Sequence, residues 1–243
     1  MTDRLYYEDS HLTAFPAVVT ACEQEKDCWK VTLDQTAFFP EGGGQAGDTG
    51  YLGEIEVFDT HEKNGEIWHY TRHPLEVGAE VKGVLDWEKR FSRMQQHSGE
   101  HIVSGLIHTR FGYNNVGFHL GEEEVTMDFN GPITKEELLE IETAANQVVF
   151  GNVPIQISYP SREELEILDY RSKIEIEGQV RIVTIPDVDV CACCAPHVNN
   201  TGEIGLIKLT NVQSHRGGVR VNLLAGDRAL CDYREKETSV KAV

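Results

Sequence analysis

The sequence has few basic residues and no long apolar run, and each shortage excludes a class of protein. Lys and Arg number 22 against 40 Asp and Glu, which gives a formal net charge of −18. A chain this acidic does not adhere broadly to nucleic acid through a basic face. No run of about 20 apolar residues suits a membrane span, and the opening "MTDRLYYEDSHLTAFP" has no signal-like apolar core. We therefore expect a cytoplasmic protein with no membrane and no DNA partner.

Cysteine is also scarce, with six residues in a chain of 243, and three of them crowd into "CACC". So few cysteines in so long a chain do not form a disulfide scaffold, and close neighbours in sequence pair poorly with each other. We expect reduced thiols or metal ligands at these positions.

Residues 1–90 contain a series of short β-like runs that are separated by Gly, Asp and Pro. This spacing is typical of a small antiparallel β-barrel. Helical periodicity begins at Trp87 and stops at Gly112. Two further helices begin at capping boxes, Thr134 with Glu137 and Ser161 with Glu164. Between them lie more β-like runs, so residues 91–243 are predicted to form an α+β domain with helices on a mostly antiparallel sheet.

The segment "HSGEH" places His97 and His101 four residues apart, on one face of the predicted helix. The same spacing recurs in "CCAPH" with Cys193 and His197, where the proline makes an extended loop more natural than a helix. Three imidazoles and one thiolate can hold zinc tetrahedrally, so the sequence predicts a Zn²⁺ site. Cys193 is favoured because its spacing mirrors the histidine pair, while Cys191 and Cys194 remain alternative thiol ligands.

Other functions fit parts of this pattern. His97, Glu100 and His101 form H-x-x-E-H, in which the glutamate acts as general base of a metallopeptidase. That enzyme needs a third ligand from Glu122–Glu124 or Glu142, and it leaves "CACCAPH" unexplained. A zinc-stabilised binding module without catalysis is a further alternative. Glu100 itself is either a proton relay or a carboxylate on the helix surface.

Three ordered motifs carry a resemblance to a known family. "HSGEH" and, about ninety residues later, "CCAPHVNNTGEIG" resemble the metal motifs of the alanyl-tRNA synthetase editing domain. "TAFFPEGGGQAGDTG", residues 36–50, resembles the glycine-rich signature of the barrel that precedes that domain. The chain is thus similar to the medium-length freestanding alanyl-tRNA editing proteins (AlaX). It departs from them where their second motif reads Cys-Gly-Gly-Thr-His, because Cys194, Ala195 and Pro196 fill the middle here.

The resemblance implies hydrolysis of the ester that joins serine, or glycine, to tRNA(Ala), with the acceptor end of that tRNA as partner. Zinc would activate a water or position the substrate. Glu100 stands where many of these relatives carry a small polar residue, so its role as a proton relay or as a helix-surface carboxylate stays open. The glycine-rich segment would line the pocket from its own domain and help to sense the serine hydroxyl. The expected substrate contacts there are Thr36, Gly43, Gly44 and Gln45.

Basic residues gather late in the chain, between Lys208 and Arg234. This distribution fits either a solvated face of a C-terminal sheet or a local contact to nucleic acid. Because glycines beside Arg216 and Arg220 let a backbone come close, these two arginines are the expected tRNA-binding residues.

Overall fold

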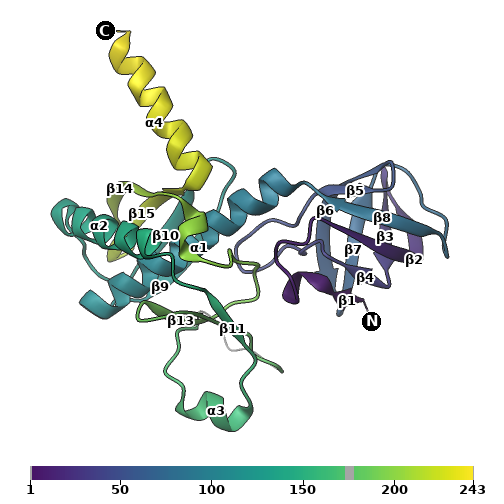
Figure 1. Cartoon of the computed structure of the whole chain (residues 1–243), viewed down its shortest axis with the longest axis horizontal. Coiled ribbons are helices and arrows are strands. Elements are labelled where there is room, and N and C mark those ends of the chain that lie inside the picture. Colours follow the sequence, from purple (N-terminus) through teal and green to yellow (C-terminus); the bar gives the residue numbers. More distant parts are fainter. Residues whose placement is uncertain (1, 173–177, 243) are drawn as a thin grey trace. The chain divides into compact units, whose positions relative to one another are not determined.

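The computed structural model describes residues 2–172 and 178–242, and the chain divides into two units, Met1–Phe91 and Ser92–Val243. Figure 1 shows the strands of the first unit and the helices and sheets of the second. The helix α1 (Trp87–Phe111) begins at the end of the first unit and continues into the second.

The first unit is a closed barrel with the strand order β2-β3-β7-β6-β5-β8. Neighbouring strands are antiparallel, as the sequence predicted. Apolar side chains that alternate along the strands fill its interior, including Phe15, Val31 and Leu52. The strands are β2 (Ala14–Glu25), β3 (Cys28–Leu33), β5 (Gly50–Leu52), β6 (Ile55–Lys63), β7 (Glu66–Thr71) and β8 (Glu80–Leu85). Beside them lie β1 (Asp3–Arg4), β4 (Gln35–Thr36) and the short 3₁₀ helix η1 (Leu5–Tyr7).

The glycine-rich segment ends in a tight turn and is fixed at its base by a buried ion pair. Gly43 and Gly44 have φ angles of 60° and 81°, a left-handed geometry that favours glycine, between the mutually bonded Gly42 and Gln45. Further along, the Asp48 carboxylate accepts hydrogen bonds from the Phe39 amide and the Arg90 guanidinium. Side chains of both partners of the ion pair are at most 2% exposed.

A neutral, fully buried histidine lies on the barrel strand β7. His69 Nδ1 lies 3.0 Å from the Val31 carbonyl oxygen, which can only accept, so Nδ1 carries the proton and Nε2 accepts from the Thr36 hydroxyl at 2.8 Å. Burial lowers the pKa of His69 to about 4. A proton added at Nε2 would reverse the bond to Thr36 and bury a charge.

This histidine predicts a pH-dependent loss of stability. Since the folded-state pKa of His69 is below the unfolded value of about 6.5, the unfolded chain binds more protons between these values, and stability falls as pH falls. From pH 7 to 5.5 the wild type should lose about 1 kcal/mol more than His69→Gln, which does not titrate there. Urea unfolding followed by tryptophan fluorescence reports on the barrel, because Trp29, Trp68 and Trp87 all lie in the first unit. Equal losses in both proteins would contradict a neutral buried His69.

The described residues of the second unit form two antiparallel sheets. One has the strand order β14-β15-β10-β9, and the other β11-β12-β13. The strands of the first are β9 (Asn115–Leu120), β10 (Val125–Phe129), β14 (Ile207–His215) and β15 (Gly218–Ala225). Those of the second are β11 (Gln156–Ser158), β12 (Ile182–Ile185) and β13 (Asp189–Ala192). With its helices, this unit has the predicted α+β class.

Helix α1 is the central element of this unit. Every residue over 94–105 is buried, and many of them are polar, so each needs a hydrogen-bond partner inside the protein. Gln96, for example, bonds both the amide and the carbonyl of Ala225 at 2.7 and 2.8 Å. The helix ends before Gly112, whose φ is 72°, as predicted. A buried polar helix of this kind is typical of a helix that carries a functional site.

The remaining helices confirm two predictions and correct a third. The two predicted capping boxes are present at the starts of α2 (Lys135–Gly151) and α3 (Arg162–Ile167). A short 3₁₀ helix, η2 (Thr201–Ile204), follows the loop after β13.

The interpretation of a basic C-terminal sheet face was wrong for Arg228 and Arg234, because both lie on α4 (Gly226–Lys241). This helix extends away from the rest of its unit (Figure 1), and only Ala229 on it is buried.

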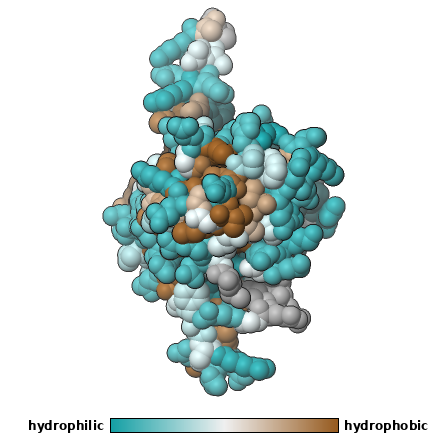
Figure 2. Space-filling model, turned by 90° about the vertical axis from the view of Figure 1, so that its right-hand side faces the viewer, coloured by the Kyte–Doolittle hydropathy of each residue, from teal (hydrophilic) through white to brown (hydrophobic). Residues whose placement is uncertain are grey.

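The surface reflects the charged composition. In the view of Figure 2, hydrophilic side chains surround one compact apolar patch. Among the described residues, no helix combines the length and apolar character that crossing a bilayer requires.

Candidate metal centre

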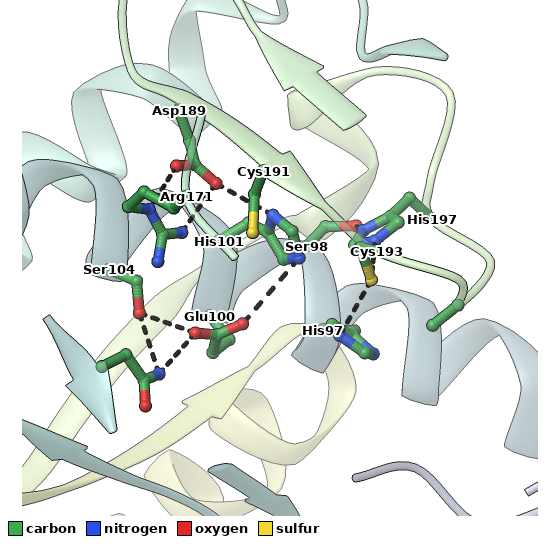
Figure 3. Close-up of polar contacts among 12 residues, drawn as sticks. His97, Ser98, Glu100, His101, Ser104, Arg171, Asp189, Cys191, Cys193 and His197 are labelled. Atoms are coloured by element: carbon green, nitrogen blue, oxygen red, sulfur yellow. Dashed lines mark hydrogen bonds and ion pairs between the residues drawn. The ribbon is translucent and has the colours of Figure 1, made fainter. Parts of the chain in front are cut away.

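The four predicted ligands come together in the second unit. Helix α1 contributes His97 and His101, and the loop that follows β13 contributes Cys193 and His197 (Figure 3). Their candidate ligand atoms all lie within 4.8 Å of one another. The three histidines are each 2% exposed, whereas Cys193 is only partly buried. The arrangement therefore joins two segments that are about ninety residues apart in sequence.

The distances fit a tetrahedral metal ion. Cys193 Sγ lies 3.6 Å from His97 Nε2 and 3.4 Å from His197 Nε2. Zinc bonds of about 2.3 Å to sulfur and 2.0–2.1 Å to nitrogen imply a sulfur–nitrogen separation of about 3.5 Å in a tetrahedron. A set of one thiolate and three imidazoles is soft enough for zinc. The four residues could therefore hold a zinc ion without large rearrangement.

At Cys193 and at His197 the ionisation of the cluster favours the form that binds metal. Burial raises the pKa of the Cys193 thiol, but the charge of His97 and hydrogen bonds from the surrounding imidazoles outweigh it, so this pKa lies well below its usual range. Burial lowers the pKa of His197 to about 3, which keeps that ring neutral. Thiolate and neutral imidazole are the species that bind zinc. Burial also lowers the pKa of His101, yet the nearby thiols and the Asp189 carboxylate raise it well above its usual value.

Two of the imidazoles are oriented by partners on their far side. His101 Nδ1 lies 2.9 Å from the Asp189 carboxylate, and His197 Nδ1 lies 3.0 Å from the Ser98 hydroxyl. Ser98 also accepts a hydrogen bond from the amide of Val198. Because Nδ1 is engaged in each ring, Nε2 is the atom that faces the other ligands, and such partners fix ring orientation in metal sites.

Glu100 lies inside the protein, so the interpretation as a carboxylate on the helix surface was wrong. Its side chain is 1% exposed, and Oε1 accepts hydrogen bonds from Ser104 Oγ at 2.6 Å and Asn115 Nδ2 at 2.7 Å. Its other oxygen, Oε2, lies 3.9 Å from His101 Nε2, the nitrogen that faces the cluster (Figure 3). A carboxylate in this place is positioned to exchange a proton beside a bound metal.

The two alternative thiols lie in different surroundings. Cys194 is exposed and belongs to neither group of potential ligands among the described residues. Cys191 is buried, its pKa is raised by burial, and it lies with His101 and Asp189 in a second group. That second group is a poor cation site because the Arg171 guanidinium already binds both Asp189 oxygens, at 2.7 and 2.9 Å. The geometry therefore favours Cys193 as the thiol ligand.

A buried arginine shapes the loop that carries the two later ligands. Arg181 Nη1 donates to the carbonyl oxygens of Cys193 and Ala195, at 2.9 Å each. The Cys193 amide in turn donates to the Arg181 carbonyl. The Arg181 side chain thus helps to fix the backbone of "CCAPH", although this segment has no regular secondary structure.

Sequence reasoning missed the residues around the ligands. Ser98, Arg171, Arg181 and Asp189 share no spacing that connects them with the metal motifs, and only the fold brings them together. Strand β13, "DVCA", alternates between buried and partly buried positions, but the buried positions are Asp189 and Cys191. Polar residues that face inward hide a strand from a pattern search that looks for buried apolar side chains.

The glutamates that a metallopeptidase would need lie elsewhere. Glu142 on α2 binds the Lys208 ammonium and the Leu209 amide, both at 2.7 Å. Glu122, Glu123 and Glu124 are exposed. Within the described part of the chain, none of these carboxylates belongs to a ligand group with His97 and His101, whereas Cys193 and His197 do.

The expected substrate contacts lie in the first unit, in two environments. Thr36 is fully buried, and its hydroxyl bonds His69 Nε2 and the Phe38 amide. Gly43 and Gly44 are exposed at the tip of their turn, while the neighbouring Gln45 is buried. Their role in substrate binding stays a prediction.

The expected tRNA-binding arginines also differ from each other. Arg216 is exposed in the turn between β14 and β15, with a φ of 46° beside Gly217. Arg220 forms a two-pronged pair with Asp128 at 2.7 and 2.8 Å, and this guanidinium lowers the pKa of Asp128. A phosphate would have to compete with that carboxylate at Arg220, which makes Arg216 the more accessible cation.

Comparisons with known proteins find relatives of this chain. Residues 2–89 match the family model for class II (A) tRNA synthetases, and residues 180–221 match the model for the second additional domain of threonyl and alanyl tRNA synthetases. Over 97% of its length the chain is 34% identical to the alanyl-tRNA editing protein AlaX-L of Pyrococcus horikoshii, covering 61% of that protein. It is 31% identical to the alanyl-tRNA editing protein Aarsd1 of Rattus norvegicus, covering 62% of it.

An alanine–tRNA ligase from Natronomonas pharaonis is 36% identical over 94% of the chain, which covers 26% of that enzyme. The chain thus spans about three-fifths of the length of the editing proteins it matches and about a quarter of the ligase. The second of the two matched segments contains Cys193 and His197.

Proposed function

We propose, on the premise that the chain belongs to the family of the alanyl-tRNA editing proteins, that it is a zinc-dependent hydrolase that removes serine, or glycine, from mischarged tRNA(Ala). The observation that carries the proposal is the buried group of His97, His101, Cys193 and His197, with the Glu100 carboxylate beside it. The four residues would hold one zinc ion per chain.

The reaction is the hydrolysis of an ester. Water adds to the carbonyl carbon, the bond to the ribose oxygen breaks, and the ribose hydroxyl leaves with a proton. Zinc, when bound, supplies a Lewis acid that polarises oxygen and eases deprotonation of water. Glu100 accepts the proton of the attacking water at Oε2 and passes it to the ribose oxygen, while Ser104 and Asn115 hold Oε1 in place.

Removal and return of the metal test this proposal. If the zinc is catalytic, the chelated protein should stop hydrolysing seryl-tRNA(Ala) while it remains folded, and stoichiometric zinc should restore the rate. Circular dichroism in both states serves as the control for folding. Full activity of the metal-free protein would contradict a zinc-dependent reaction. Loss of activity together with loss of fold would favour a zinc-stabilised binding module.

The acidic chain should hold tRNA through few phosphates. We propose that Arg216 and Arg220 contact the acceptor end, Arg216 more strongly because Arg220 is paired with Asp128. Two to four phosphate contacts predict that log affinity falls against log salt with a slope of roughly 1.5–3.5 in magnitude. Deacylation at subsaturating tRNA across a salt series measures this slope. In Arg216→Ala with Arg220→Ala the slope should decrease, and an unchanged slope would place the tRNA-binding surface elsewhere.

A further inference from the structure

One of the metal-facing imidazoles is held by a buried carboxylate. The Asp189 side chain is 1% exposed, and its Oδ2 lies 2.9 Å from His101 Nδ1. Arg171 donates a hydrogen bond to each oxygen of this carboxylate, so the carboxylate acts as the acceptor toward its partners. The carboxylate accepts from His101, so Nδ1 carries a proton and Nε2 is the ring nitrogen that faces the ligand cluster.

The carboxylate is itself fixed by an arginine from another segment. Arg171 donates to Asp189 Oδ1 through Nε at 2.7 Å and to Oδ2 through Nη2 at 2.9 Å. Two parallel bonds between a planar guanidinium and a carboxylate define the orientation of both groups. Figure 3 shows the chain of contacts from Arg171 through Asp189 to His101.

The backbone of Arg171 is also tied to the strand that carries Asp189. Its amide donates to the Val190 carbonyl at 2.8 Å, and its carbonyl accepts from the Ala192 amide at 2.9 Å. The segment that returns from α3 therefore adds to β13 at this point, where Arg171 forms a bridge with Cys191. The position of the guanidinium is set by backbone pairing and not by a mobile side chain alone.

The close approach of β13 to α1 depends on a glycine. A Cβ at Gly105, one helical turn after His101, would lie 2.3 Å from the Val188 carbonyl oxygen and 2.8 Å from Asp189 Cβ. Such a separation is too short for any side chain, so glycine at this position allows Asp189 to reach the His101 ring.

From these contacts we infer that Asp189 and Arg171 are positioning residues of the zinc site, which act on metal affinity by holding His101 with Nε2 directed at the metal. The inference rests on the proposed zinc function of the cluster. Carboxylates that hold the far nitrogen of a metal-binding histidine typically change metal affinity 10–100-fold when they are replaced.

The substitution Asp189→Asn keeps the shape of the side chain and removes the match of donors and acceptors. In one orientation the amide NH₂ faces His101 Nδ1 and favours the tautomer with its proton on Nε2. In the other orientation the NH₂ faces the Arg171 donors. Either arrangement weakens the hold on His101, as does Arg171→Gln, which removes the two-pronged pair.

Zinc affinity measured by competition with a chelator tests the inference without any assay of deacylation. Asp189→Asn and Arg171→Gln should each bind zinc 10–100-fold more weakly than the wild type. Asp187→Asn is the matched control, because Asp187 is exposed two residues away, and its affinity should stay within about twofold of the wild type. Wild-type affinity in Asp189→Asn and Arg171→Gln would overturn the inference.

A second background shows whether the effect passes through His101. When His101→Ala is already present, adding Asp189→Asn should change zinc affinity less than about twofold, because the ring to be positioned is missing. A loss as large as in the wild-type background would assign Asp189 to another role. The zinc-loaded wild type gives a check that needs no variant. NMR should detect a slowly exchanging proton on His101 Nδ1, and the absence of this proton would also overturn the inference. Failure of the wild type to bind zinc would instead refute the proposed metal site.

Discussion

Replacing Cys193 with alanine is expected to reduce bound zinc from one ion per chain to none and to abolish deacylation. Cys193 Sγ lies 3.4–3.6 Å from the Nε2 atoms of His97 and His197, and among the described residues no other cysteine joins these histidines in a ligand group. Three imidazoles without the thiolate lack the ligand that both neutralises and softens the site. Metal analysis of the purified variant, with circular dichroism to verify folding, measures the effect.

The neighbouring cysteines provide matched controls for this experiment. Cys194→Ala changes an exposed side chain, and Cys191→Ala changes a buried thiol that lies against Asp189. Both variants should retain their zinc. Zinc that persists in Cys193→Ala and is lost from the other two variants would show that the ligand is a different thiol.

The second large effect concerns the buried carboxylate beside the cluster. Glu100→Gln should slow deacylation by about 10²–10⁴-fold, the range for a lost general acid or base, and should leave the zinc content unchanged. The amide preserves the volume of the side chain and can still bond Ser104, so the fold should tolerate it. Single-turnover kinetics at saturating protein separate this loss from weaker tRNA binding.

Two outcomes would contradict the assigned role of Glu100. A rate close to that of the wild type would make the carboxylate a structural partner of Ser104 and Asn115. Peptidase activity in the wild type that disappears in Glu100→Gln would favour the H-x-x-E-H metallopeptidase. A neighbouring control is Glu88→Gln, near the exposed start of the same helix, which should leave the rate unchanged.

The ligands could be predicted from sequence because their pattern is local. His97 and His101 follow helical spacing, and Cys193 and His197 repeat that spacing in a loop. The residues that orient them could not be found in the same way, since Asp189 is 88 positions from His101 and 18 from Arg171. The bridge between Arg171 and β13 and the close approach of β13 to α1 bring these three together, and no short motif records either contact.

The fold shows the same division between local and long-range information. The barrel strands and the two capped helices have periodic apolar residues or capping boxes, and they were predicted. Helix α4 was missed because it has a single buried residue and lacks the apolar stripe by which an amphipathic helix is recognised. Glu100 could not be placed by pattern, because the whole of 94–105 is buried and no polar face distinguishes its side chain.

The central claim is that this chain hydrolyses mischarged tRNA(Ala) at the cluster of His97, His101, Cys193 and His197. The most direct measurement incubates the zinc-loaded protein separately with seryl-, glycyl- and alanyl-tRNA(Ala) and follows the loss of each amino acid. We expect the seryl ester, and with it the glycyl ester, to be hydrolysed far faster than the alanyl ester. Equal rates for all three, or rates no higher than those without protein, would contradict the claim.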